Sequence, residues 1–405
     1  MTFLLSINFI ESDKFYQGEY YYLLLSSLLG ALVVSSSRDL LTIFIGIELA
    51  STPMFLLSGW KKGDRKSNEG AIKFFLLGVL SASLILYGFS LIYGLTGQLV
   101  FADISAYLLA NSLGSSPVLL LSAILVISGI GFKISVVPFH SWAPDTYEGA
   151  PLPITAYLSV SSKATGFVAL IILLTKVFES SGQSWGVILA IVAGATMTLG
   201  NLVALQQTNP VRLLAYSSIS QAGFIIAPLA VSGITGNYQD GIFASVTYLI
   251  IYAFMNIGAF LSVHLFTNFT KSDNFYEWGG IAKHSPLTGV LTTVFFFSLA
   301  GIPPLGGWFA KFVVFRSLLS TGEIIGVSLA IVGAINAVIA LVYYARISKV
   351  IWMDELKNPE EEKSFEFQSP LKVVGALTVL ITFVAGIFPG IFSYLGEVSS
   401  IFFGN

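Results

Sequence analysis

The chain has 405 residues, of which 55% are hydrophobic and only 10% are charged, and its formal net charge is −2. Soluble domains carry about 25% charged residues, so this composition excludes an ordinary soluble protein. The sequence contains no cysteine and three histidines, which excludes iron–sulfur ligation within the chain and gives little support for a haem or metal site. It also has no GxGxxG or Walker-type loop, and no basic stripe that would bind nucleic acid.

Apolar stretches long enough to cross a bilayer recur along nearly the whole sequence. A hydrocarbon core of about 30 Å requires roughly 20 apolar residues in a helix. The stretch at 1–10 is too short to span and has no basic n-region, so residues 1–17 are predicted to be an N-terminal remnant and not a signal peptide. Eleven spanning helices of an all-α membrane bundle are predicted, at 18–36, 39–60, 70–94, 117–139, 153–176, 184–205, 211–232, 240–266, 286–316, 325–351 and 371–395.

Two of these helices contain residues that interrupt helical structure. Pro138 falls at the end of one segment, and the run Gly301–Gly307, GIPPLGG, falls in the middle of another, so breaks are predicted near 138 and near 303. Proline removes a backbone donor and glycine adds no rigidity. Broken backbone at membrane depth persists only where protein or a water-filled cavity satisfies it. Two broken helices therefore favour a functional site, with simple proline kinks as the alternative.

The spans group into two copies of a five-helix unit, at 18–178 and 184–352, followed by one C-terminal helix at 371–395. Arg38 and Arg212 open the second helix of each copy, and each copy has one broken helix. Because five is odd, the two copies must run in opposite directions. Inverted repeats with broken helices are typical of transporters whose site lies near the middle of the membrane.

Four charged residues fall inside predicted spans: Glu48, Lys133, Lys163 and Lys311. One charge at the bilayer centre costs roughly 2.5–3.5 kcal/mol, and four cost on the order of 10 kcal/mol, which is comparable to the stability of a domain. Three lysines outnumber one carboxylate, so ion pairing alone cannot neutralise them all, and burial favours the uncharged amine. We predict that this buried row relays protons; a purely structural pairing of Glu48 with Lys133 is the alternative.

Three further residues are weaker candidates. Lys73 lies near the start of its helix and either joins the row or extends its amine to the cytoplasmic surface. His140 follows Pro138 and either titrates at the mouth of the broken helix or is a plain interfacial histidine. His264, near the end of its helix, either gates a path or anchors at the interface.

Four segments together carry a resemblance to a known family over nearly the whole chain. They are GIELASTPMFLLSGW, GFKISVVPFHSWAPDTYEGAPLPITAYLSVSSKATG, QTNPVRLLAYSSISQAGF and SLAGIPPLGGWFAKF. They resemble the subunit N family (subunit 2 in mitochondria) of the antiporter-like, proton-pumping subunits of respiratory complex I, NADH:quinone oxidoreductase. The sister antiporter-like subunits carry a related but different sequence in the second segment.

The resemblance implies a role for each buried charge. Glu48 looks like the glutamate that pairs with the lysine of the first broken helix, here Lys133. Lys163 looks like the connecting lysine, and Lys311 like the lysine of the second broken helix, where one sister subunit carries glutamate. Bacterial members have fourteen spans, so three N-terminal helices are missing here, as in animal mitochondrial versions; the loss is either natural or a start assigned too late.

The sequence thus predicts a non-redox, proton-translocating subunit of a complex I-type enzyme in an energy-transducing membrane, the bacterial plasma membrane. The resemblance implies no cofactor in this chain, with NADH, FMN, iron–sulfur clusters and quinone on partner subunits. The expected partners are sister antiporter-like subunits, a small multi-span subunit and the lipid bilayer. The alternatives are a subunit of a multi-subunit Na⁺/H⁺ antiporter, a purely structural membrane subunit, and a photosynthetic relative fed by ferredoxin.

The distribution of basic residues predicts the topology. Of the 20 Lys and Arg residues, three are the buried lysines, and 14 of the other 17 lie on the side of the N-terminus. By the positive-inside rule, the N-terminus is cytoplasmic and the C-terminus is outside. A reporter fused after Lys66 should read cytoplasmic, and one fused in the 98–116 loop should read external. The reverse pattern would overturn this orientation.

Overall fold

The computed structural model describes residues 1–11, 18–355 and 369–404, and within these ranges the chain forms helices and no β-strand. Ten described helices are long and apolar enough to cross a membrane, which confirms the predicted all-α membrane bundle. The ninth predicted span, 286–316, is divided into two helices of 15 residues each. Part of the predicted N-terminal remnant, residues 12–17, lies outside the described ranges.

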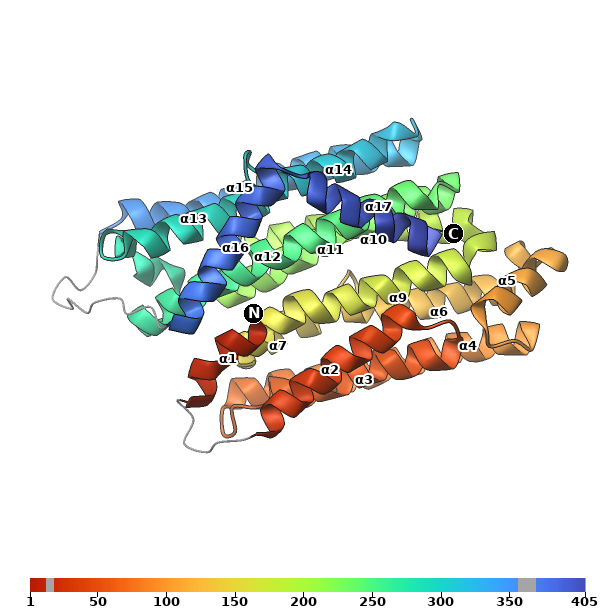
Figure 1. Cartoon of the computed structure of the whole chain (residues 1–405), viewed down its shortest axis with the longest axis horizontal. Coiled ribbons are helices and arrows are strands. Elements are labelled where there is room, and N and C mark those ends of the chain that lie inside the picture. Colours follow the sequence, from red (N-terminus) through yellow and green to blue (C-terminus); the bar gives the residue numbers. More distant parts are fainter. Residues whose placement is uncertain (12–17, 356–368, 405) are drawn as a thin grey trace.

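The segment predicted as the first repeat, residues 18–178, contains the helices α2 to α9 and follows the short helix α1 (Figure 1). The connection between α3 and α4 lies at the lower left of Figure 1, and α5 lies at the right end. Its elements are α1 (Thr2–Glu11), α2 (Glu19–Ser36), α3 (Leu40–Ser58), α4 (Arg65–Thr96), α5 (Phe101–Ala110), η1 (Leu113–Ser115), α6 (Pro117–Ile134), α7 (Trp142–Gly149), α8 (Leu152–Tyr157), the π-helical turn η2 (Leu158–Ser162), α9 (Lys163–Lys176) and η3 (Glu179–Ser181).

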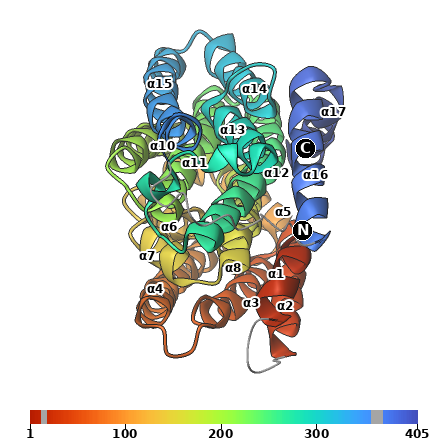
Figure 2. The same ribbon diagram turned by 90° about the vertical axis from the view of Figure 1, so that its left-hand side faces the viewer.

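The segment predicted as the second repeat, residues 184–352, corresponds to the helices α10 to α15. Two C-terminal helices follow and lie along one flank of the bundle (Figure 2). Its elements are α10 (Gly182–Ala204), α11 (Pro210–Thr235), α12 (Tyr238–Thr270), η4 (Phe275–Trp278), η5 (Ile281–Lys283), α13 (Pro286–Ala300), α14 (Gly306–Ser320) and α15 (Ile324–Met353), followed by α16 (Ser369–Ile387) and α17 (Gly390–Gly404).

Side-chain caps fix the starts of equivalent helices in the two repeats. The carboxylate of Asp39 accepts hydrogen bonds from the N–H groups of Leu41 and Thr42, at 3.0 and 2.8 Å, at the start of α3. The amide oxygen of Asn209 does the same for α11, with Val211 and Arg212 at 2.9 and 3.1 Å. Such caps satisfy amide groups that a helix leaves free at its N-terminus.

The predicted helix 117–139 is wrong at its end, because α6 stops at Ile134. Ser135 takes a left-handed conformation with φ 59°, and the N–H groups of Ser135 and Val136 bind the carbonyls of Phe132 and Gly131. This arrangement terminates a helix. The backbone stays non-helical until α7 begins at Trp142. The turn at Ser135 thus sets the break, and α6 ends five residues before the predicted end at 139.

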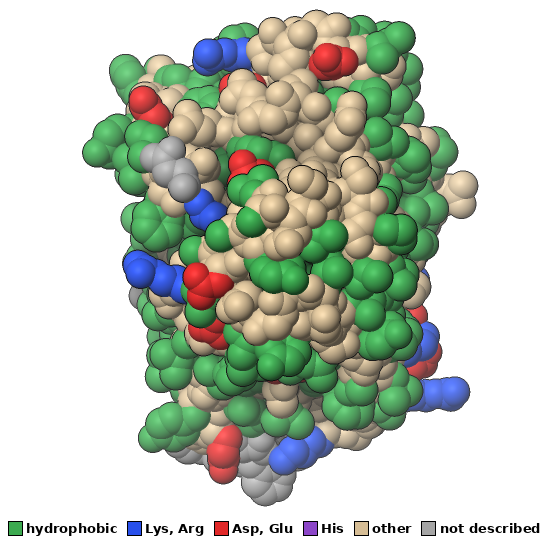
Figure 3. All heavy atoms as spheres, turned by 90° about the vertical axis from the view of Figure 1, so that its right-hand side faces the viewer, with side chains coloured by type: hydrophobic (Ala, Val, Ile, Leu, Met, Phe, Trp, Pro, Cys, Tyr) green, Lys and Arg blue, Asp and Glu red, His purple; other side chains and the backbone are tan. Residues whose placement is uncertain are grey.

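The C-terminal helix predicted at 371–395 is also wrong, because it is two helices. α16 ends at Ile387 and α17 starts after Pro389, since proline cannot continue the hydrogen-bond ladder of the preceding helix. α16 packs against α12 and α14, and α17 packs against α12. The end of the molecule at which α5 lies shows acidic and basic side chains singly or in small groups among apolar and neutral surface (Figure 3).

The break between α13 and α14 brings backbone from the two helices into close contact. A Cβ atom added to Gly307 would lie 1.7 Å from the carbonyl oxygen of Ser298, which is backbone and cannot move aside. Gly307→Ala should therefore lower the free energy of unfolding by about 1–3 kcal/mol or more, measured as a fall in the thermal unfolding midpoint. Gly94→Ala, at an open helical position, is the matched control and should be neutral. Equal midpoints for both variants would contradict this packing.

Candidate functional site

The last turn of α6 carries Lys133 toward one face of α3. Its Nζ lies 3.9 Å from Oε1 of Glu48 and donates a hydrogen bond to the hydroxyl of Ser51. The ring of Phe55 lies on the same side, with its centroid 5.6 Å from Nζ. Glu48, Ser51 and Phe55 are three and four residues apart, the spacing that places side chains on one helix face. α3 thus offers the amine a carboxylate, a hydroxyl and an aromatic ring.

Glu48 is less buried than the sequence predicted. Its side chain is 29% exposed, whereas that of Lys133 is 6% exposed. Glu48 is therefore only partly buried in the chain by itself, with one carboxylate oxygen buried and part of the side chain exposed on the outer face of α3. At 3.9 Å the pair is longer than a hydrogen bond, and the buried Oε1 has no hydrogen-bond partner among the described residues. The two charged groups are therefore close together, but no hydrogen bond joins them.

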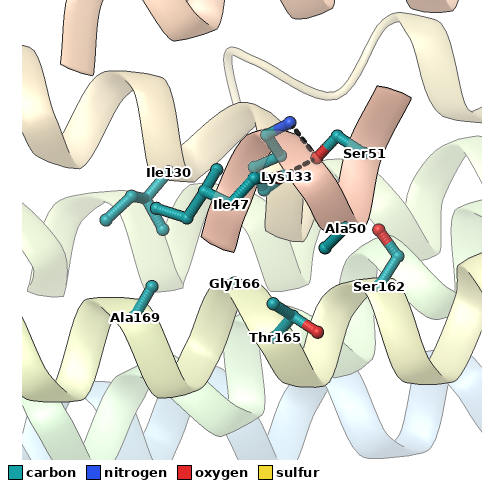
Figure 4. Close-up of a pocket in the computed structure, with 9 residues that line it drawn as sticks. All are labelled: Ile47, Ala50, Ser51, Ile130, Lys133, Ser162, Thr165, Gly166 and Ala169. Atoms are coloured by element: carbon teal, nitrogen blue, oxygen red, sulfur yellow. Dashed lines mark hydrogen bonds between the residues drawn. The ribbon is translucent and has the colours of Figure 1, made fainter. Parts of the chain in front are cut away.

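A small cavity separates Lys133 from the helix that carries Lys163 (Figure 4). Its volume is about 10 Å³, close to the least that one water molecule requires. Ser162 and Thr165 reach it from the far side, and Lys133 and Ser51 from the near side. The remaining lining is apolar and comprises Ile47, Ala50, Ile130, Gly166 and Ala169.

Lys163 stands directly after the π-helical turn η2, a feature that sequence patterns did not predict. Such turns insert one extra residue per turn and occur frequently at functional sites. The Nζ of Lys163 donates to both oxygens of Ser218 on α11, at 2.8 Å to the carbonyl and 2.5 Å to the hydroxyl. Lys163, in the first predicted repeat, is therefore bound to α11 in the second.

Lys311, on α14, donates to the carbonyl of Ala300 at 2.5 Å. This carbonyl ends α13 and would accept from residue 304 in a continuous helix. Residue 304 is Pro304, which has no N–H. The ring of Phe224 lies beneath the amine, with its centroid 5.2 Å from Nζ. The helix break thus creates the acceptor that holds this lysine.

Polar side chains on α11 connect the Lys163 and Lys311 sites. Gln221 lies three residues after Ser218, on the same face of the helix. Its Nε2 donates to the carbonyl of Leu299 at 3.2 Å, next to the carbonyl that binds Lys311, and its Oε1 accepts from the hydroxyl of Tyr248. Sequence reasoning did not single out these residues. The available signal was the polar run SSISQ inside the most buried span of the bundle.

Of the weaker candidates, Lys73 and His264 lie apart from this row, whereas His140 lies near Lys163. Lys73 is 43% exposed and binds Asp145 and Glu69 at 2.6 and 2.7 Å. His264 contacts Asn268 on its own helix at 3.0 Å. His140 lies in the non-helical segment after α6, and burial lowers its pKa; its Nδ1 has no hydrogen-bond partner among the described residues. Within the same ranges, no group of three or more His, Asp or Glu side chains could hold a metal ion.

The chain is similar to known proteins along almost its whole length. A family model described as NADH:quinone oxidoreductase/Mrp antiporter, TM, matches residues 37–338. NADH-quinone oxidoreductase subunit N of Moorella thermoacetica is 39% identical over 389 residues, which are 96% of this chain and 79% of that protein.

Solved structures share the fold. A chain of respiratory complex I from Thermus thermophilus with bound aureothin matches with a TM-score of 0.76 and 27% identity, over 94% of this chain and 81% of that one. A chain of the Mrp complex from Dietzia sp. matches with a TM-score of 0.83, over 95% of this chain and 77% of that one, and at 20% identity this likeness shows the fold alone. The sequence and structural matches together place the chain among the antiporter-like membrane subunits of NADH:quinone oxidoreductase, in the subunit N family.

Proposed function

We propose that the chain translocates protons across the membrane through Glu48, Lys133, Lys163 and Lys311, without redox chemistry of its own. The observation that carries this proposal is the row of three buried lysines, each in contact with an irregular helical segment. Lys133 lies at the end of α6, Lys163 follows η2, and Lys311 binds the end of α13. Hydroxyl, amide and carbonyl groups of α11 and α13 lie between the second and the third.

The partners of these lysines support proton exchange over permanent ion pairing. Among the described residues, Lys163 and Lys311 have no carboxylate within ion-pair distance, and their acceptors are neutral oxygens. Burial disfavours an ammonium group that no opposite charge balances. Only Lys133 has an acid nearby, Glu48 at 3.9 Å. A small movement of Glu48 would therefore change how firmly Lys133 holds its proton.

In this proposal, electron transfer in partner subunits changes the field or packing at one end of the row. Protons then enter from the cytoplasmic side, which the basic residues predict, and leave outside. The partly exposed face of Glu48 would lie against a neighbouring membrane subunit. The cofactors of the parent complex, NADH, FMN, iron–sulfur clusters and quinone, would reside on those partners. The chain itself would lie in the bacterial plasma membrane.

Two other functions can be distinguished from this proposal by experiment. A Na⁺/H⁺ antiporter subunit would share the fold, as the Dietzia chain does. Co-purification separates the two, because partners with flavin and iron–sulfur clusters indicate a complex I-type enzyme and redox-free membrane partners indicate an antiporter. A purely structural subunit would leave proton pumping intact when Lys133 is replaced.

Lys133→Ala should reduce proton pumping coupled to quinone reduction by about tenfold or more, as expected when a positioned proton-transfer group is lost. The complex should still assemble. Lys133→Arg should not rescue fully, because arginine hardly releases its proton. Normal pumping by an assembled Lys133→Ala complex would remove this residue from the mechanism.

A double-mutant cycle tests whether Glu48 and Lys133 act as one unit. Glu48→Gln should impair pumping more than assembly, and Glu48→Asp should keep part of the activity because the charge remains. The losses from Glu48→Gln and Lys133→Ala should not add, since residues in contact show interaction energies of roughly 0.5–3 kcal/mol. Pumping rates of the four assembled variants provide the measurement, and simple additivity would show that Glu48 acts separately.

A further inference from the structure

The short helix α7 carries two carboxylates that bind cations from both repeats. Lys66 and Lys73 of α4 bind Glu148 and Asp145, at 2.8 and 2.6 Å. A single guanidinium nitrogen of Arg212, on α11, lies 2.8 Å from an oxygen of each carboxylate. These five residues form the α7 ion-pair cluster. Glu69 lies 2.7 Å from Lys73, and Asp273 lies 3.9 Å from Lys66, at its edge.

The opposite side of α7 reaches the lysine sites. The indole N–H of Trp142 donates to the carbonyl of Phe132 at 2.9 Å, the residue directly before Lys133. Trp142 is fully buried and stacks on Phe74, with ring centroids 4.2 Å apart. Tyr147 is also fully buried, and its hydroxyl approaches Ser218, the residue that binds Lys163. One helix of eight residues thus contacts the surroundings of two relay lysines.

The position of α7 depends on these side contacts. The non-helical segment 135–141 separates it from α6, so helix continuity cannot hold it in place. Isolated helices of this length are unstable in water. Toward α4 the packing is close, because a Cβ added to Gly149 would lie 2.3 Å from the carbonyl oxygen of Lys66. Toward α11, ionic contact is made through Arg212.

The carboxylates of the cluster stay charged, which excludes them as proton carriers near neutral pH. Burial opposes the ionisation of both groups. Hydrogen bonds from Lys73 and Arg212 nevertheless hold the pKa of Asp145 below its ordinary value, and those from Lys66 and Arg212 do the same for the pKa of Glu148. A depressed pKa means that the ion pairs are intact above the ordinary range of a carboxyl group and are lost only as the pH falls through the folded-state values.

We propose that Arg212 is a positioning residue that fixes α7 to the second repeat, and thereby sets the spacing of the Lys133 and Lys163 sites. This inference rests on the proposed relay function. Arginine suits the place because its planar guanidinium presents several donors in a fixed geometry, whereas lysine presents a point charge. Removal of the guanidinium leaves Asp145 and Glu148 bound to α4 alone, so α7 stays with the first repeat and loses its ionic contact with the second.

The test uses the whole complex with Arg212→Gln, Arg212→Lys and a matched control, Arg346→Gln. Arg346 also lies on a spanning helix, but it donates to the carbonyl of Leu205 and lies outside the cluster. Arg212→Gln should lower the rate of proton pumping by about tenfold, since a small misplacement of reacting groups lowers rates by that factor or more. It should also raise hydrogen exchange in residues 142–149. Arg212→Lys should recover part of both, and Arg346→Gln should change neither.

The pH dependence separates positioning from a general loss of stability. In the wild type, the protection of the α7 amides, meaning their exchange rate relative to that of an unstructured chain at the same pH, should be constant from pH 6 to 8. The carboxylates remain ionised throughout this range, which begins about two units above their ordinary pKa values. In Arg212→Gln, exchange should be raised across this whole range. Wild-type exchange and pumping in an assembled Arg212→Gln complex would overturn the inference. Normal pumping by Lys133→Ala would instead refute the relay itself, so the two failures are distinguishable.

Discussion

A carbonyl group at the end of a broken membrane helix is the constraint on which the rest of this structure depends. Such a group needs a donor from the protein, because the surrounding hydrocarbon supplies none. At Ala300 the next helical donor would be Pro304, which has no N–H, and the amine of Lys311 takes its place. The break leaves the carbonyl of Ala300 without a backbone donor, and the buried lysine supplies that donor. The acceptor is a neutral carbonyl, and among the described residues no carboxylate pairs with this amine, so nothing there offsets the effect of burial, which favours the uncharged amine.

Polar side chains along α11 bind groups from both predicted repeats. Near its start Arg212 binds the carboxylates of α7, further along Ser218 binds Lys163, and one turn later Gln221 reaches the end of α13. All three contacts come from a span that is almost entirely buried, so each polar group must find its partner in the protein. A single helix thus couples the position of α7, the middle lysine and the second break.

The fold could be predicted further than the site. Long apolar runs and their charged interruptions are local in sequence, so the spans and the four charged positions followed from composition and spacing. The end of α6 did not, because a left-handed Ser135 and not Pro138 terminates it. The exposure of Glu48 and the bonds of Ser218 and Gln221 depend on which helix lies opposite, and no periodicity within one helix contains that information. Serine and glutamine in a buried span indicated a polar contact without naming its partner.

The central claim is that the polar groups between Lys163 and Lys311 relay protons, and Gln221 lies between them with hydrogen bonds to Leu299 and Tyr248. The most direct test is the number of protons pumped per electron by Gln221→Leu, which removes both hydrogen bonds of the amide while keeping a side chain of similar size. Ser220→Ala, a buried neighbour that lies against α10 at Gly200, is the control. The account predicts a large fall in the ratio for Gln221→Leu, with quinone reduction retained, and a normal ratio for Ser220→Ala. A wild-type ratio in an assembled Gln221→Leu complex would contradict it.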